Sequence, residues 1–377
     1  MKKIFWCRRI LIAISMSLIW QPSLSQELAA NETVANRSRP ALDPIGMRVG
    51  GFQLFPQLDI SAAHNDNVFA QEVDETSDRI FAIEPRIELR SNWSRHDLNV
   101  GADAAIRRFR DNSGEDHEDH TIWASGRLDV SRSGLLAADV RHARRHEDRE
   151  SPNDVQGTER TAFDVNSVIV YYLTRPEANS MTVRLEGAYR DFIYEDSFDL
   201  SGPINNSDRD RGVLSGTLRL GYAPTPYYSL FVQGETRSVS YDDEFDDAGF
   251  QRDFDSDEVS FGVALDYSGL IFGDVFFGFR SDTFDDPRFS DIDGPSFGVD
   301  VSWNITGLTT LSLSGRRSVE PTTIVDVSGV VETRLGLRVD HELLRNLVLG
   351  LEWVTVEEDF DGIDRKDNID TIDFSAR

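Results

Sequence analysis

Seven histidines are the side chains in this 377-residue chain that are best suited to acid–base or metal chemistry. They are His64, His96, His117, His120, His142, His146 and His341. The sequence has neither a GxSxG nucleophile elbow nor an HExxH helix. His117 and His120 fall in one predicted acidic loop, 111–120, and could take a metal there, although an ordinary polar loop is the simpler interpretation. We therefore expect no enzymatic activity.

Carboxylates form the second group with potential chemistry. The clusters are Asp242-Asp243, Asp246-Asp247 and the spaced set Asp359, Asp361 and Asp364. Closely spaced carboxylates suit Ca²⁺, but none of these clusters has the ligand spacing of an EF-hand loop. We predict solvated loop charge, with no metal and no cofactor. The net charge of −27 also argues against nucleic acid as a partner, because phosphate binding needs a basic surface.

The remaining charges alternate with apolar residues along short segments. In 331–339, Leu335 and Leu337 occupy one face of a strand, whereas Glu332, Arg334 and Arg338 occupy the other. About sixteen such segments follow one another from residue 51 onward. Each has roughly ten residues, which is the length of a tilted transmembrane strand. We predict that the charged rows line a water-filled interior. The candidate lining residues are Glu84, Arg86, Glu88, Arg90, Asp103, Arg107, Arg127, Asp129, Arg184, Glu186, Arg219, Glu235, Arg237, Glu258, Asp266, Arg280, Asp300, Arg316, Glu332, Arg334, Arg338 and Glu352. A self-satisfied ion-pair lattice is the alternative reading of the same charges.

The connections between these segments are short and long in alternation. Segments 131–134 and 304–308 are short, whereas 196–210 and 242–257 are long and acidic. A soluble sandwich would also show alternating faces, but so many consecutive strands would leave edges unprotected. Closure removes those edges and is obligatory in lipid, where each unpaired backbone group costs several kcal/mol. We predict an all-β, transmembrane, up-and-down antiparallel β-barrel over residues 49–377. An interfacial girdle near the short turns would comprise Trp93, Tyr222, Tyr227, Tyr228, Tyr267 and Trp303.

The N-terminus has the features of a secretory signal peptide. Lys2, Lys3, Arg8 and Arg9 precede or flank an apolar run, 10–20, and Ser23-Leu24-Ser25 is a small-x-small site. We predict a cleaved signal peptide over 1–25 and a flexible periplasmic lead-in over 26–48. Cys7, the single cysteine, lies in the leader, so the exported protein would contain no disulfide.

Five segments at the strand–turn junctions are distinctive: HNDNVFA (64–70), WSRHDLNVGADAAIRRFRDNSGEDHEDH (93–120), LIFGDVFFGFRSDTFDDP (270–287), DGPSFGVDVSWNITGLTTL (293–311) and DHELLRNLVLG (340–350). They resemble the putative beta-barrel porin 2 family, outer-membrane barrels of Gram-negative bacteria. Several members are encoded with exopolysaccharide biosynthesis and export genes. The resemblance implies an outer-membrane, porin-like conduit linked to exopolysaccharide export. It also implies membrane lipid, lipopolysaccharide, the barrel assembly machinery and exopolysaccharide or its export proteins as partners.

Members of the family usually finish on a strand with a terminal aromatic residue, whereas this chain finishes at Phe374-Ser375-Ala376-Arg377. The comparison leads us to expect one further closing hairpin, and so about eighteen strands in the parent protein. A complete sixteen-strand barrel with an unusual end is the alternative. The alternative to a conduit is a non-conducting structural barrel. Such a barrel would bind polymer or partner proteins through its long acidic extracellular loops.

Overall fold

The computed structural model describes residues 32–40, 42–71, 73–155, 157–174, 179–199 and 202–377. The predicted signal peptide lies outside them. Sixteen long strands make up most of this part of the chain. They are β2 (Phe52–Asn65), β3 (Asp78–Ser91), β4 (Asp97–Phe109), β5 (His117–Asp129), β6 (Gly134–His146), β7 (Ala162–Thr174), β8 (Ser180–Tyr194), β11 (Arg211–Thr225), β12 (Tyr228–Tyr241), β13 (Phe254–Tyr267), β14 (Ile271–Phe284), β15 (Ile292–Thr306), β16 (Thr309–Glu320), β17 (Val330–Leu344), β18 (Leu347–Phe360) and β19 (Lys366–Ala376). The short elements are β1 (Met47–Val49), β9 (Ser197–Asp199), β10 (Gly202–Ile204) and the 3-10 turns η1 (Ser113–Glu115) and η2 (Ser207–Arg209).

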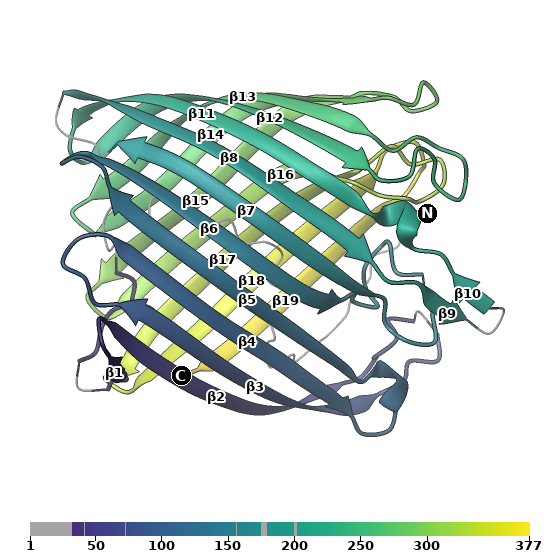
Figure 1. Cartoon of the computed structure of the whole chain (residues 1–377), viewed down its shortest axis with the longest axis horizontal. Coiled ribbons are helices and arrows are strands. Elements are labelled where there is room, and N and C mark those ends of the chain that lie inside the picture. The colour runs from purple at the N-terminus through teal and green to yellow at the C-terminus, as the bar shows by residue number, and fades with distance from the viewer. Residues whose placement is uncertain (1–31, 41, 72, 156, 175–178, 200–201) are drawn as a thin grey trace.

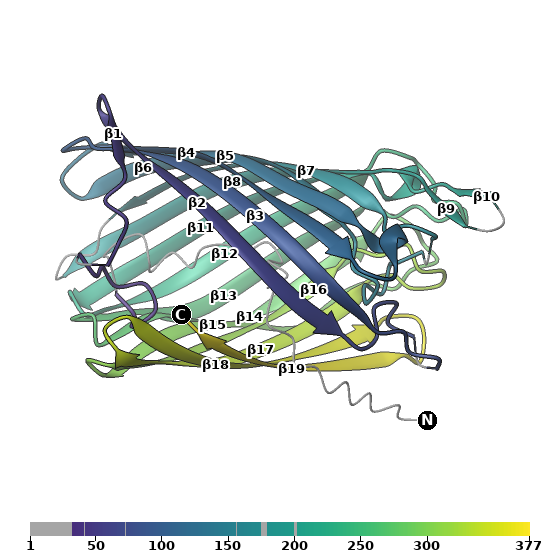
Figure 2. The same cartoon turned by 90° about the horizontal axis from the view of Figure 1, so that it is seen from below.

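Each long strand pairs antiparallel with the next long strand along the chain, and the tilted strands curl into a barrel (Figure 1). β8 pairs directly with β11, because β9 and β10 form a separate hairpin that projects from the long-loop end. β19 stands next to β2 in the sheet order, although the described residues of these two strands have no residue-by-residue ladder. The short turns gather at one end and the long loops at the other (Figure 2). The predicted barrel is confirmed.

Strand alternation separates an apolar outer face from a polar inner face. On β14 the side chains of Phe277 and Phe279 are 64% and 57% exposed, whereas that of Arg280 is 5% exposed. In a membrane barrel the exposed apolar row faces lipid, so this exposure has no cost in the native environment. The six aromatic residues predicted for the girdle are all exposed beside the short turns. Among the described residues, no helix has the length and hydropathy needed to cross a membrane.

The loop predicted over 111–120 is wrong in extent. β5 begins at His117, so His117 and His120 belong to a strand. An odd separation puts their side chains on opposite faces of that strand, and they cannot form one loop metal site. The prediction failed because β5 is polar on both faces in its first four residues, His117–His120, and therefore shows no apolar period there.

Candidate functional site

Charged side chains of the inner face are joined across neighbouring strands. Arg338 on β17 donates to Glu352 on β18 at 2.8 Å, and its Nε donates to Asp340 at 2.8 Å. The apolar neighbours Leu351 and Trp353 are exposed on the opposite face. The pairing that the alternating charges suggested is therefore present in this part of the wall.

Some contacts join strands that are not neighbours. Arg219 on β11 lies 3.2 Å from Asp274 on β14. Arg237 on β12 donates to the carbonyl oxygen of Val319 on β16 at 2.9 Å. Strands three and four places apart in a barrel can meet only through its interior. Both guanidinium groups must therefore point inward, and the interior is narrowed between β11 and β16.

The structure forms ion pairs among most of the predicted lining residues. The pairs are Arg86 and Arg90 with Glu88, Arg107 with Glu84, Arg127 with Asp129, Arg184 with Glu186, Arg237 with Asp282, Arg280 with Glu235 and Glu258, and Arg334 with Glu332. In the ladders, Asp103, Asp266, Asp300 and Arg316 lie opposite Arg86, Phe272, Asp274 and Arg334, respectively. That these residues line a conduit stays a prediction.

The inner carboxylates that were missed from the sequence include Asp119, Asp274 and Asp282. Asp119 accepts a hydrogen bond from Arg107 at 3.0 Å and lies 2.9 Å from the Nδ1 of His146. A signal for Asp282 was present, because it follows Arg280 by two residues and so shares its face. Asp119 gave no such signal, since it stood in the segment taken for a loop.

The long-loop end is held by buried ion pairs between loops. Glu115, which is 1% exposed, accepts hydrogen bonds from Arg149 Nη2 at 2.6 Å and from Arg160 Nε at 2.8 Å. Arg209, from the β8–β11 connection, donates to Glu147 at 2.7 Å. Three successive connections of one wall, those after β4, β6 and β8, are thereby tied into one unit.

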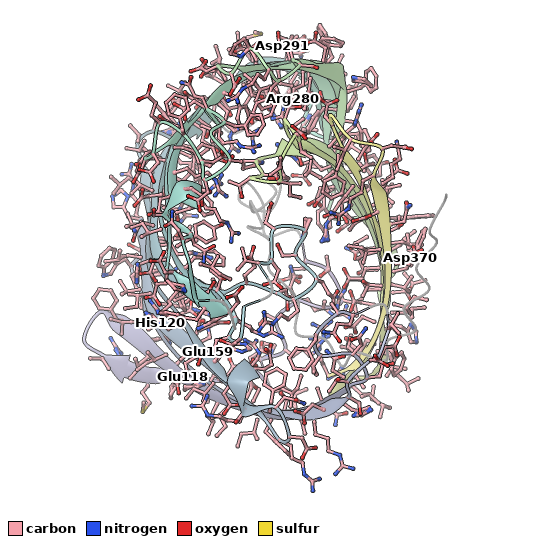
Figure 3. All side chains as sticks on the ribbon, turned by 90° about the vertical axis from the view of Figure 1, so that its right-hand side faces the viewer. Glu118, His120, Glu159, Arg280, Asp291 and Asp370 are labelled. Carbon is pink, nitrogen blue, oxygen red and sulfur yellow. The ribbon has the colours of Figure 1, made fainter. Side chains whose placement is uncertain are left out.

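A second set of contacts crosses the mouth at this end. The hydroxyl of Thr322 donates to the side-chain oxygen of Asn153 at 2.6 Å. Their loops, β16–β17 and β6–β7, are half a turn of the barrel apart. Arg252, buried beside Asp246 at 2.7 Å, donates to the carbonyl oxygens of Val327 and Thr322. Figure 3, viewed from the long-loop end, shows these loops crossing the opening of the ring. We call this set of loop contacts the outer bridge.

Some carboxyl groups in the loops have shifted pKa values, and Asp286 and Asp208 are examples of the two directions. Hydrogen bonds from Arg288 hold the pKa of Asp286 well below its ordinary value of 3.8. Burial raises the pKa of Asp208, and the neighbouring carboxylates of Asp247 and Asp246 raise it further. The outer loops therefore contain both charged carboxylates that the fold stabilises, such as Asp286, and charged carboxylates that it destabilises, such as Asp208.

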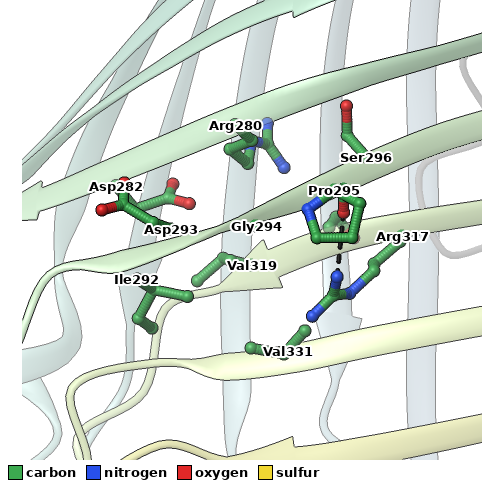
Figure 4. A pocket seen from close by; sticks show the side chains of 11 residues that line it. Arg280, Asp282, Ile292, Asp293, Gly294, Pro295, Ser296, Arg317, Val319 and Val331 are labelled. Carbon is green, nitrogen blue, oxygen red and sulfur yellow. Dashed lines mark hydrogen bonds between the residues drawn. The ribbon is translucent and has the colours of Figure 1, made fainter.

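The wall contains a small cavity close to Arg280. A cavity of about 20 Å³ lies between β14, β15 and β16, where Arg280, Asp282 and Ser296 line it and Arg317 donates to the carbonyl oxygen of Pro295 at 2.9 Å (Figure 4). That volume holds about one water molecule. Within the described ranges, no group of three or more His, Cys, Asp or Glu side chains is arranged to hold a metal ion.

Several solved structures share part of this arrangement. The ferric enterobactin receptor PfeA, from Pseudomonas aeruginosa, matches 82% of this chain and 54% of its own, with 11% identity and a TM-score of 0.42. The alcaligin outer-membrane receptor FauA from Bordetella pertussis matches 85% of this chain and 58% of its own, with 11% identity and a TM-score of 0.38. The copper transporter OprC matches 88% of this chain and 58% of its own, with 11% identity and a TM-score of 0.42. This chain thus spans between a half and two thirds of the length of each.

Sequence comparison is more specific than the structural likeness. A search of curated protein sequences finds no match. The family model for putative beta-barrel porin 2 matches residues 39–377, which is the whole barrel and the residues just before it. The chain therefore belongs to the putative beta-barrel porin 2 family.

Proposed function

We propose that this barrel is an outer-membrane conduit for hydrophilic solutes in a Gram-negative bacterium. The observation that carries the proposal is the separation of faces, with Phe277 and Phe279 exposed outside while arginines such as Arg219 and Arg237 point inward. An interior lined by opposed charges favours hydrated, polar solutes over apolar ones. Passage would need no covalent chemistry, so the proposed role is non-enzymatic.

The family supports a narrower proposal, that the solute is an exopolysaccharide on its way to the cell surface. Membrane lipid, lipopolysaccharide and the barrel assembly machinery are proposed partners on the same basis. Delivery would begin with removal of residues 1–25. Cell fractionation, with N-terminal sequencing of the mature protein, tests location and cleavage together.

A second candidate is a non-conducting barrel that binds polymer or partner proteins through its acidic loops. The outer bridge favours it, because the contact between Asn153 and Thr322 spans the mouth. The two candidates differ in one measurable quantity, the current through a single barrel.

Single-channel recording in a planar bilayer tests the conduit. We expect discrete current steps from the folded wild type, and larger steps from Thr322→Ala, which removes the hydroxyl that meets Asn153. The matched control is Thr371→Ala, an exposed threonine of β19. If wild type and Thr322→Ala are both folded and both silent, the conduit is excluded and the second candidate stands.

A further inference from the structure

The described residues ahead of the first long strand are attached to the far side of the β19–β2 junction. We call residues 32–40 and 42–46 the N-terminal strap. In Figure 2 this dark purple segment runs from β1 across the short-turn end. β1 pairs with the first residues of β2, with Val49 opposite Phe52 and Met47 opposite Leu54. The other end of the strap contacts β15, β16 and β17, on the opposite side of β18 and β19.

The strap is held to the wall by its backbone at two points. The backbone N–H of Val34 donates to the hydroxyl of Thr310 at 2.9 Å, and both residues are buried. The side-chain amide of Asn304 donates to the carbonyl oxygen of Glu32 at 2.8 Å. Hydrogen bonds to backbone groups fix the path of the segment along the wall, which attraction between charged side chains alone would not do.

Two arginines of the strap share one carboxylate of the wall. Arg37 lies 2.5 Å and Arg39 3.1 Å from the same oxygen of Glu342. Arg37 also donates to the carbonyl oxygen of Gly307 at 2.6 Å, and Arg39 to that of Val34 at 2.7 Å. The Glu342 side chain is only 10% exposed, so this pairing is shielded from solvent more than a surface ion pair is.

Gly46 directs the strap into β1. Its φ is +73°, and a Cβ at this position would lie 2.7 Å from the ring of Phe55 on β2. A side chain would therefore meet both an unfavourable backbone conformation and a steric clash. The strap is thus anchored at both ends, to β2 through Phe55 and β1 and to β15–β17 through Glu342.

We propose that the N-terminal strap is a latch that ties the first strand of the barrel to β15–β17 across the β19–β2 junction. β2 and β19 lack a residue-by-residue ladder in the described residues, whereas the other neighbouring long strands have one. The strap joins β2, through β1, to β16 and β17, through Thr310 and Glu342. It therefore links the two sides of the junction without being part of the ladder between them. The latch does not depend on whether the interior conducts.

Protection from trypsin at the Arg37–Ser38 bond tests whether the strap is docked. Glu342→Ala removes the acceptor of two charged hydrogen bonds, so we expect cleavage of the folded protein to accelerate about tenfold or more. Arg48→Ala is the control, because Arg48 is an exposed arginine of β1 whose loss should leave the rate unchanged. Equal cleavage of wild type and Glu342→Ala would overturn the docking.

The temperature at which the folded form loses its fast mobility on a denaturing gel tests the latch itself. We expect it to fall in Glu342→Ala and not in Arg48→Ala. A disulfide between Val34→Cys and Thr310→Cys, in Cys7→Ser protein, should raise it when oxidised and have no effect when reduced. Two results would show that the strap is docked but is no latch. One is faster cleavage of Glu342→Ala with no fall in the temperature at which the fast mobility is lost. The other is a disulfide that forms but does not raise that temperature. Conductance of these variants separately tests the proposed conduit.

Discussion

Replacement of Glu115 by Gln gives the sharpest test of the buried loop network. Glu115 is 1% exposed and accepts four hydrogen bonds, three from Arg149 at 2.6, 3.2 and 3.2 Å and one from Arg160 at 2.8 Å. Gln keeps the shape and one acceptor oxygen but removes the charge. Asp154 and Asp148 remain as carboxylates paired with these arginines.

The expected cost follows from burial. Removal of one partner from a buried ion pair costs about 3–5 kcal/mol, because the remaining charge is left without compensation. Since about 1.4 kcal/mol corresponds to a factor of ten, the opening equilibrium of the loops would rise by a factor of about 10² or more. Asp367→Asn is the matched control. Asp367 pairs with Arg365 at 2.5 Å, but the two side chains are 26% and 42% exposed, so the expected cost is about 0–1 kcal/mol.

Trypsin cleavage after Arg149 or Arg160 in folded protein reports opening of this network, and equilibrium urea unfolding in lipid reports its contribution to the whole barrel. We expect rapid cleavage only in Glu115→Gln, with a smaller change in global stability if the loops open locally. Equally slow cleavage of wild type, Asp367→Asn and Glu115→Gln would refute the reasoning, since the loops would then stay closed without the buried carboxylate.

Three other changes separate lipid-facing from loop effects. Leu335→Arg places a charge on the lipid-facing row and should cost about 2–4 kcal/mol in urea unfolding, whereas Leu335→Ile should cost little. Hydrogen bonds from Arg288 lower the pKa of Asp286, so its contribution to stability is complete above about pH 4 and is lost as the pH falls further. Asp286→Asn should remove that acid dependence from a series of unfolding curves, and an unchanged series would contradict the assignment. Burial raises the pKa of Asp208, so the folded state loses stability as the pH rises from about 4 through the raised value. Asp208→Asn should therefore be more stable than wild type at pH 7 and not at pH 3, as judged by the same unfolding assay.

The strands and their faces could be predicted because the signal repeats locally. The alternation of Leu335 and Leu337 with Arg334 and Arg338 needs only the two-residue period of a strand. The opposite signs of the inner charges also predicted that such residues pair across neighbouring strands, as Arg338 and Glu352 do. Membrane strands are well suited to this reasoning, since lipid penalises any charge on the outer face.

The bridge and the strap could not be predicted, because their contacts join residues with no regular spacing in the chain. Asn153 and Thr322 are 169 residues apart, and Arg37 and Glu342 are 305 apart. Each contact depends on the curvature of the whole sheet and on loop conformations that no period encodes. The same limit explains the error at His117, where polar residues on both faces of a strand had the composition of a loop.

The length of the strands has a consequence for how the protein meets its membrane. β13 has 14 residues, which at about 3.3 Å each and a tilt of about 40° rise roughly 35 Å along the barrel axis, against an apolar band about 25 Å tall. Hydrogen-bonded sheet therefore continues for several ångströms beyond the hydrocarbon. In a thicker or thinner bilayer the hydrocarbon boundary would still fall on hydrogen-bonded strand, so no unpaired peptide group would be exposed to lipid. We therefore expect the barrel to tolerate hydrophobic mismatch better than a barrel whose strands end at the lipid boundary.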